Sequence, residues 1–151
     1  GKVDEVLLYW RDSPQRLTRV DPRCSHDSLR NLKVDFFLRT FWGAEEGGWS
    51  LPPDKRRLII WGAGPNGKAL VKTLRAKGLE PAYFTDILPA RHGQTICGLR
   101  VLPLEGLPDP RDYFLLTAVG NPYSREEIRA FLRARGWLEG RDFYCMAGIS
   151  D

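Results

Sequence analysis

Short continuous apolar runs recur along the chain from about residue 57 onward. Runs of this kind are typical of parallel strands that are buried on both faces. They occupy residues 58–61, 82–85, 113–119 and 142–146, with a shorter extended run at 99–102. Between the first two runs, Leu70, Val71 and Leu74 recur at helical spacing. Strands and helices that alternate with short connections predict an α/β domain with a parallel sheet and crossover helices.

Two helices of this domain carry signals at their ends. The first follows a glycine-rich turn and is expected to end near Gly78, because glycine readily adopts the left-handed conformation beyond a helix C-terminus. The second has Ser124 and Glu127 at the S-x-x-E spacing of a capping box, which predicts its first turn there. Gly136 predicts its end.

The first 54 residues have a different pattern and predict an N-terminal extension. An apolar run at residues 6–10 is typical of a strand, and a polar, turn-rich stretch follows it. Ser25 is expected to cap a helix over residues 26–42. The apolar residues of that helix recur at helical spacing: Leu29, Leu32, Phe36, Phe37 and Phe41. A glycine pair and a proline pair in residues 43–54 predict a linker, so we divide the chain into residues 1–54 and 55–151.

The turn after the first strand of the domain carries the strongest motif. Its residues, Gly62, Ala63, Gly64, Pro65, Asn66 and Gly67, match G-x-G-x-x-G between a buried strand and a helix. An acid, Asp86, ends the second strand about 20 residues later, as in dinucleotide-binding folds. In such a turn the glycines allow close approach of a pyrophosphate to the helix N-terminus. We therefore predict a small Rossmann-like domain whose ligand site comprises these six residues and Asp86.

Three other interpretations of the same residues stay open. The run Gly62–Lys68 also matches G-x-x-x-x-G-K, but a P-loop needs Ser or Thr next, where this chain has Ala69. The turn can also serve only to pack a strand against a helix, with no ligand. Asp86 can accept hydrogen bonds from a ribose diol, or it can cap a loop.

Composition and charge narrow the class of protein. The net charge of +4 is spread along helix faces without aromatic residues between the basic ones, so no nucleic-acid partner is expected. No apolar stretch reaches 18 residues, so no membrane span is expected. Three cysteines without C-x-x-C pairing predict reduced thiols in a cytoplasmic protein, with Cys97 and Cys145 in the core. His92 is expected to be a solvated loop residue.

The chemistry of a complete oxidoreductase is absent from the sequence. No Tyr-x-x-x-Lys pair is present, and no second half follows that would hold a nicotinamide. An NAD(P)-binding half of an oxidoreductase therefore remains only as an alternative. A ligand-free interaction module is the other alternative.

The order of the motifs resembles the C-terminal domain that follows the catalytic domain in certain bacterial family 2 (GT-A) glycosyltransferases. The resemblance rests on residues 58–67, Asp86, 118–122 and 140–145. The N-terminal extension is in turn similar to the closing segment of that catalytic domain. This similarity rests on residues 9–12 with Trp10-Arg11, residues 16–19 and Ser25.

The glycosyltransferase resemblance implies a function for the whole chain. A GT-A catalytic domain needs an Asp-x-Asp pair for its metal, and none occurs here. The chain is then expected to be a non-catalytic, C-terminal part of a longer enzyme, inactive alone, with the missing catalytic domain as its partner.

The Rossmann-like part is also similar to the nucleotide-sugar-binding domain of PglD-type sugar acyltransferases. That resemblance implies that a UDP-sugar is as good a ligand candidate as NAD(P). The sequence leaves the sugar donor, the acceptor and a homo-oligomeric state open.

Overall fold

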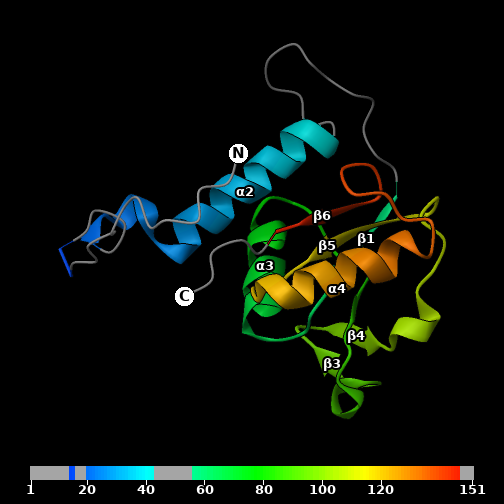
Figure 1. The fold of residues 1–151 in the computed structure, drawn as a ribbon. Helices are drawn as coiled ribbons and strands as arrows, with labels where there is room; N and C mark the ends of the chain where they lie inside the picture. Colours follow the sequence, from blue (N-terminus) through cyan, green and yellow to red (C-terminus); the bar gives the residue numbers. More distant parts are fainter. Residues whose placement is uncertain (1–13, 16–19, 43–55, 147–151) are drawn as a thin grey trace, which may run out of the picture.

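The computed structural model describes residues 14–15, 20–42 and 56–146 of the chain (Figure 1). Its strands are β1 (Arg57–Trp61), β2 (Tyr83–Thr85), β3 (Thr95–Ile96), β4 (Leu99–Leu102), β5 (Tyr113–Thr117) and β6 (Phe143–Cys145). Its helices are α2 (His26–Phe41), α3 (Pro65–Ala76) and α4 (Pro122–Arg133). Short 3-10 helices occur at η1 (Pro22–Cys24), η2 (Pro89–Arg91) and η3 (Leu104–Gly106).

The six strands form one sheet in the order β3-β4-β2-β1-β5-β6. All neighbours are parallel except β3 and β4, which form an antiparallel hairpin at one edge. The central strand β1 pairs with β5 from Arg57↔Tyr113 to Trp61↔Thr117. This arrangement confirms the predicted Rossmann-like α/β fold.

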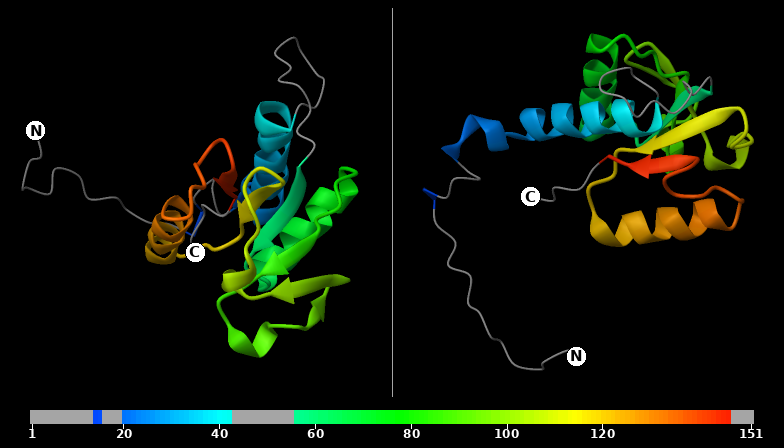
Figure 2. Two further views of the ribbon diagram at one scale, coloured as in Figure 1. Left: turned by 90° about the vertical axis from the view of Figure 1, so that its right-hand side faces the viewer. Right: turned by 90° about the horizontal axis from the view of Figure 1, so that it is seen from above.

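Helices cover both faces of the sheet (Figure 2). On one face, Leu58 and Ile60 of β1 pack with α2 and α3. On the other face, Ile59 and Trp61 pack with α4. The alternation along β1 follows from the period of two in a strand, and apolar residues on both sides explain its continuous apolar sequence.

The order of the strands creates a switch point at the carboxyl end of β1. The chain leaves β1 through α3 to reach β2 on one side, and it later returns to β5 on the other side. The connections after β1 and β5 then diverge to opposite faces of the sheet. Ligands of open α/β sheets bind at such points, outside the carboxyl ends of the strands.

The start of α4 differs from the sequence-based expectation. The capping box of Ser124 and Glu127 is wrong, because α4 begins at Pro122 and its N-cap is Asn121. The Asn121 side chain accepts hydrogen bonds from the backbone N–H groups of Tyr123 (2.9 Å) and Ser124 (3.2 Å). Ser124 therefore lies inside the first turn, where its side chain is available for other contacts.

Helix α2 is confirmed and packs onto the sheet. Ser25 caps it, accepting a hydrogen bond from the Ser28 N–H at 3.2 Å. Val34 and Phe37 are fully buried against the same core as α3, whereas Leu32 (65% exposed) and Phe36 (50% exposed) face outward. Several predicted segments lie outside the described residues: the strand at residues 6–10, the segments 9–12 (with Trp10-Arg11) and 16–19 that carry the glycosyltransferase resemblance, and the linker at 43–54. The division at residue 54 stays a prediction.

The hairpin of β3 and β4 contains a second difference from expectation. Cys97 lies exposed in the turn between the two strands with φ +52°, so its predicted place in the core is wrong. Cys145 is half-buried at the end of β6. Both residues and Cys24 are free thiols.

Candidate functional site

The glycine turn joins β1 to α3 with two glycines that the fold requires. Gly62 adopts φ +103°, and its N–H continues the ladder to the Thr85 carbonyl at 2.8 Å. A Cβ atom on Gly67 would lie 1.8 Å from the Gly62 carbonyl oxygen and 3.2 Å from the Phe84 ring. The first and third glycines are thus explained by the turn and by close packing of helix and strand.

The second glycine has a different environment. Gly64 is the N-cap of α3 with φ −79°, a conformation that other residues adopt freely. No side chain caps this helix, and Pro65 at its first position has no N–H. The amides of Asn66 and Gly67 lie in the first turn, where N–H groups have no partner within the helix. The N-terminus of α3 therefore keeps its capacity to bind an anion.

The carboxylate of Asp86 holds the turn in place. It is 3% exposed and accepts hydrogen bonds from the N–H groups of Ala63 (2.8 Å) and Leu88 (2.9 Å). Its Oδ2 also pairs with the Arg91 guanidinium at 2.8 Å. Burial alone would raise the pKa of Asp86, but these hydrogen bonds and the cation outweigh it and hold the pKa below its ordinary value.

Arg91 is a charged site residue that the sequence analysis did not predict. It lies at the end of η2, and its two terminal nitrogens lie 3.8 and 3.9 Å from where a Gly64 Cβ would be. One of these nitrogens pairs with Asp86, and no acceptor among the described residues takes the others. His92 was expected to be a solvated loop residue. Its Nε2 lies 2.8 Å from the backbone carbonyl oxygen of Asp86, and this contact stabilises the loop that carries Asp86 and Arg91.

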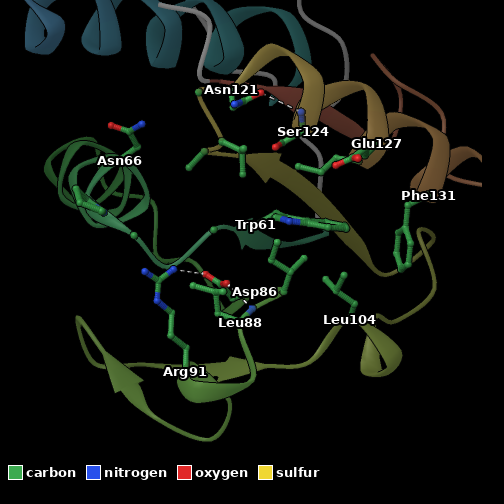
Figure 3. Close-up of a pocket in the computed structure, with 18 residues that line it drawn as sticks. Trp61, Asn66, Asp86, Leu88, Arg91, Leu104, Asn121, Ser124, Glu127 and Phe131 are labelled. Atoms are coloured by element: carbon green, nitrogen blue, oxygen red, sulfur yellow. Dashed lines mark hydrogen bonds and ion pairs between the residues drawn. The ribbon is translucent and has the colours of Figure 1, made fainter. Parts of the chain in front are cut away.

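A cavity of about 510 Å³ opens at the carboxyl ends of β1, β2 and β5, at the switch point (Figure 3). Its size is typical of small-molecule sites, which hold a few polar groups in a mainly apolar lining. Five of the seven predicted site residues line it: Gly62, Gly64, Pro65, Asn66 and Asp86. Ala63 and Gly67 are buried behind this wall, where they shape the turn.

The remaining walls come from β1 and from the segments after β4 and β5. Leu104 of η3, Ile128 and Phe131 of α4 and Val119 form an apolar side together with Trp61. The indole of Trp61 meets the Phe131 ring edge to face, with centroids 5.3 Å apart. The exposed side chains of Ile87 and Leu88 lie beyond Asp86 and also line the cavity.

Two residues of the mistaken capping box belong to this cavity. Ser124 and Glu127 lie on the side of α4 that faces it, in line with Phe131. Lys68, the lysine of the P-loop alternative, is not among the lining residues. The structure thus joins the glycine turn, the acid and its arginine, and the first turns of two helices in one site.

The described residues hold neither a metal-binding cluster nor a membrane-spanning helix. Within residues 14–15, 20–42 and 56–146, no group of three or more His, Cys, Asp or Glu side chains is arranged to hold a metal ion. In the same part of the chain, no helix combines the length and apolar character that a membrane crossing requires. The chain matches no model of a known protein family and no curated protein.

Proposed function

We propose that this domain binds a nucleotide through its phosphate groups, with a nucleotide-sugar such as a UDP-sugar as the leading ligand and NAD(P) as the alternative. The observation that carries the proposal is the position of Arg91. Its guanidinium lies beside Gly64 at the uncapped N-terminus of α3, on the wall of a cavity large enough for a small ligand.

The phosphate chemistry follows from two independent sources of positive potential. The first-turn amides of α3 and the helix dipole favour an anion at this end of the helix. Arg91 adds a planar fork of N–H donors, of which one is used by Asp86. Because the small Gly64 leaves space between these groups, phosphate oxygens are able to approach the backbone there.

The role of Asp86 in this proposal is positioning. Its carboxylate already accepts hydrogen bonds from Ala63, Leu88 and Arg91 and is almost completely buried. The observed contacts agree with the loop-capping interpretation. Asp86 orients Arg91 toward the turn and fixes the turn itself, and the proposal assigns it no contact with ribose.

The wider context that we propose is the one implied by the resemblance. The domain would be a non-catalytic, C-terminal part of a family 2 glycosyltransferase, whose catalytic domain would be its partner. A nucleotide-binding site of this kind would then sense or retain a donor nucleotide near the catalytic domain.

Isothermal titration calorimetry tests the proposal with UDP, UDP-glucose, NAD and NADP. We expect saturable binding of at least one of them to the wild-type chain. Loss of a hydrogen bond to a charged group costs about 1.5 kcal/mol or more, so Arg91→Gln is expected to weaken binding about tenfold. Gly64→Trp is expected to abolish it by filling the approach to the amides.

Arg100→Gln is the matched control, because Arg100 is an exposed arginine of β4 that does not line the cavity. This variant is expected to bind like the wild type. Absence of binding by all four ligands would support a ligand-free interaction module instead. Binding that survives Gly64→Trp unchanged would place the ligand elsewhere.

A further inference from the structure

Trp61 presents a hydrogen-bond donor that the fold does not use. The residue ends β1 and is only 3% exposed, yet it lines the cavity. No described residue accepts a hydrogen bond from its Nε1–H, and this nitrogen is not among the fully enclosed polar atoms without a partner. A tryptophan N–H at a buried position usually has an acceptor. The indole N–H thus has no acceptor among the described residues, and the nearly buried Trp61 lines the cavity.

The surroundings of this donor are apolar. Leu104, Ile128 and Phe131 line the cavity on the same side as Trp61, and the Phe131 ring contacts the indole edge to face. We refer to these four residues as the apolar arm; Figure 3 labels three of them, Trp61, Leu104 and Phe131. A flat, weakly hydrated group fits between such side chains better than a sugar ring, because each sugar hydroxyl needs its own polar partner.

Glu127 supplies an acceptor at the edge of the apolar arm. It lies directly before Ile128 on α4 and lines the cavity, and no described residue pairs with its carboxylate. Its neighbour Glu126 differs, since its carboxylate pairs with Arg129 at 2.6 Å. The cavity thus combines apolar walls with the indole N–H of Trp61 and the exposed carboxylate of Glu127, neither of which pairs with a described residue.

We propose that the apolar arm is a nucleobase subsite, in which Trp61 Nε1–H donates to a ring nitrogen or carbonyl oxygen of the base and Glu127 accepts from an N–H group. This inference rests on the proposed function, because it places the phosphates of the same ligand at Arg91 and the α3 N-terminus. Nucleobases carry acceptors and N–H donors side by side on their edges, which a phosphate or pyrophosphate alone lacks.

Ligands that differ in one group test the subsite by calorimetry. UMP, CMP, AMP and GMP share ribose and phosphate with ribose 5-phosphate and differ from it only in the base. At least one of them is expected to bind about tenfold more tightly than ribose 5-phosphate, because contacts with a base contribute on the order of 1–3 kcal/mol. Glucose 1-phosphate is included to test whether the apolar arm binds a sugar ring instead of a base.

Two conservative variants separate the two hydrogen bonds. Trp61→Phe keeps an aromatic ring but removes the N–H, and Glu127→Gln keeps the shape but removes the charge. Each is expected to weaken binding of the preferred nucleotide about fivefold and to leave ribose 5-phosphate unchanged. Glu126→Gln, one residue earlier on α4 and outside the lining, is the control and is expected to have no effect on binding.

The outcomes distinguish this inference from the proposed function. If ribose 5-phosphate binds as tightly as every nucleotide and its binding still needs Arg91, the phosphate site stands and the base subsite is wrong. If glucose 1-phosphate binding falls in Trp61→Phe while nucleotide binding does not, the arm holds a sugar and the inference is overturned. If none of the phosphate compounds binds, the proposed function fails and the subsite fails with it.

Discussion

At the scale of single residues, the three glycines of the turn have three different roles. Gly62 permits a left-handed backbone, Gly67 lets α3 pack against the Gly62 carbonyl and the Phe84 ring, and Gly64 leaves space beside Arg91. Only Gly62 and Gly67 are needed for the fold. This division separates the effects of substitutions on stability from their effects on binding.

Gly67→Ala is expected to destabilise the fold by about 2–4 kcal/mol, because the new Cβ meets backbone that cannot move aside. Gly64→Ala adds a Cβ that meets only the flexible end of Arg91 at 3.8 Å, so it should lower the free energy of unfolding only by the preference for glycine over alanine at an N-cap, about 1 kcal/mol or less. Urea unfolding measures both. Equal destabilisation by the two variants would contradict the assignment of roles.

The buried acids Asp86 and Asp142 predict acid-sensitive stability. Burial opposes the charged form of each, but hydrogen bonds and arginine partners outweigh it and lower both pKa values below the ordinary 3.8. A lowered pKa in the folded state stabilises the fold above the ordinary pKa, and the stabilisation is lost as the pH falls through the lowered value. Unfolding followed from pH 6 to pH 2 should show this loss at the acid end.

Asp86→Asn is expected to make that acid-end slope shallower and to cost about 1–3 kcal/mol at pH 7, since an amide cannot pair with Arg91 as a carboxylate does. A variant with the wild-type slope would show that Asp86 does not contribute to it.

Arg91 is an example of a site residue that cannot be predicted from the sequence. Asp86 was predictable because it ends a strand at a known interval from the glycine turn. Arg91 follows in a loop with no periodicity, and its place beside Gly64 depends on the path of η2 and on the ion pair with Asp86. Spacing carries no signal for such a contact across the site.

At the scale of elements, the strands were predictable because parallel strands buried on both faces are continuous apolar runs. The predicted start of α4 was wrong because the S-x-x-E spacing was given more weight than the Asn-Pro pair just before it. Asn121 precedes Pro122, and proline favours the first helical position after an N-cap residue. The Asn121-Pro122 pair therefore predicts the observed start of α4.

The two candidate caps of α4 give opposite expectations. Asn121→Ala removes the acceptor for two first-turn amides and should destabilise the fold by about 0.5–2 kcal/mol. Ser124→Ala should be close to neutral for stability. Denaturant unfolding of both variants settles the point, and a larger loss for Ser124→Ala would restore the capping box.

Helix α2 provides a second test of packing. Phe37 is fully buried and its ring lies 5.3 Å from that of Phe114, so Phe37→Ala is expected to cost about 3–5 kcal/mol. The half-exposed Phe36 shares the same helix, and Phe36→Ala should cost clearly less. Similar losses in thermal unfolding for both variants would mean that α2 is packed differently. The sequence could not separate the two residues, because both fit helical spacing.

At the scale of the whole molecule, the sheet order explains why one site collects residues from distant segments. The carboxyl ends of β1, β2 and β5 meet at the same edge, and the connections after them supply Gly64, Arg91 and Glu127. The sequence predicted the sheet and the turn. It could not predict the cavity, which depends on how far η3 and α4 stand from Trp61.

The central claim is that this cavity binds the phosphates of a nucleotide between the α3 N-terminus and Arg91. A ¹⁵N-resolved NMR titration with UDP tests it most directly, since it observes the amides of Gly64, Asn66 and Gly67 and the indole N–H of Trp61 in one experiment. The account predicts saturable shifts at these four groups that disappear in Gly64→Trp. Unshifted amides of Gly64, Asn66 and Gly67, with UDP and in a repeat titration with NADP, would contradict it, whereas an unshifted indole N–H alone would contradict only the nucleobase subsite.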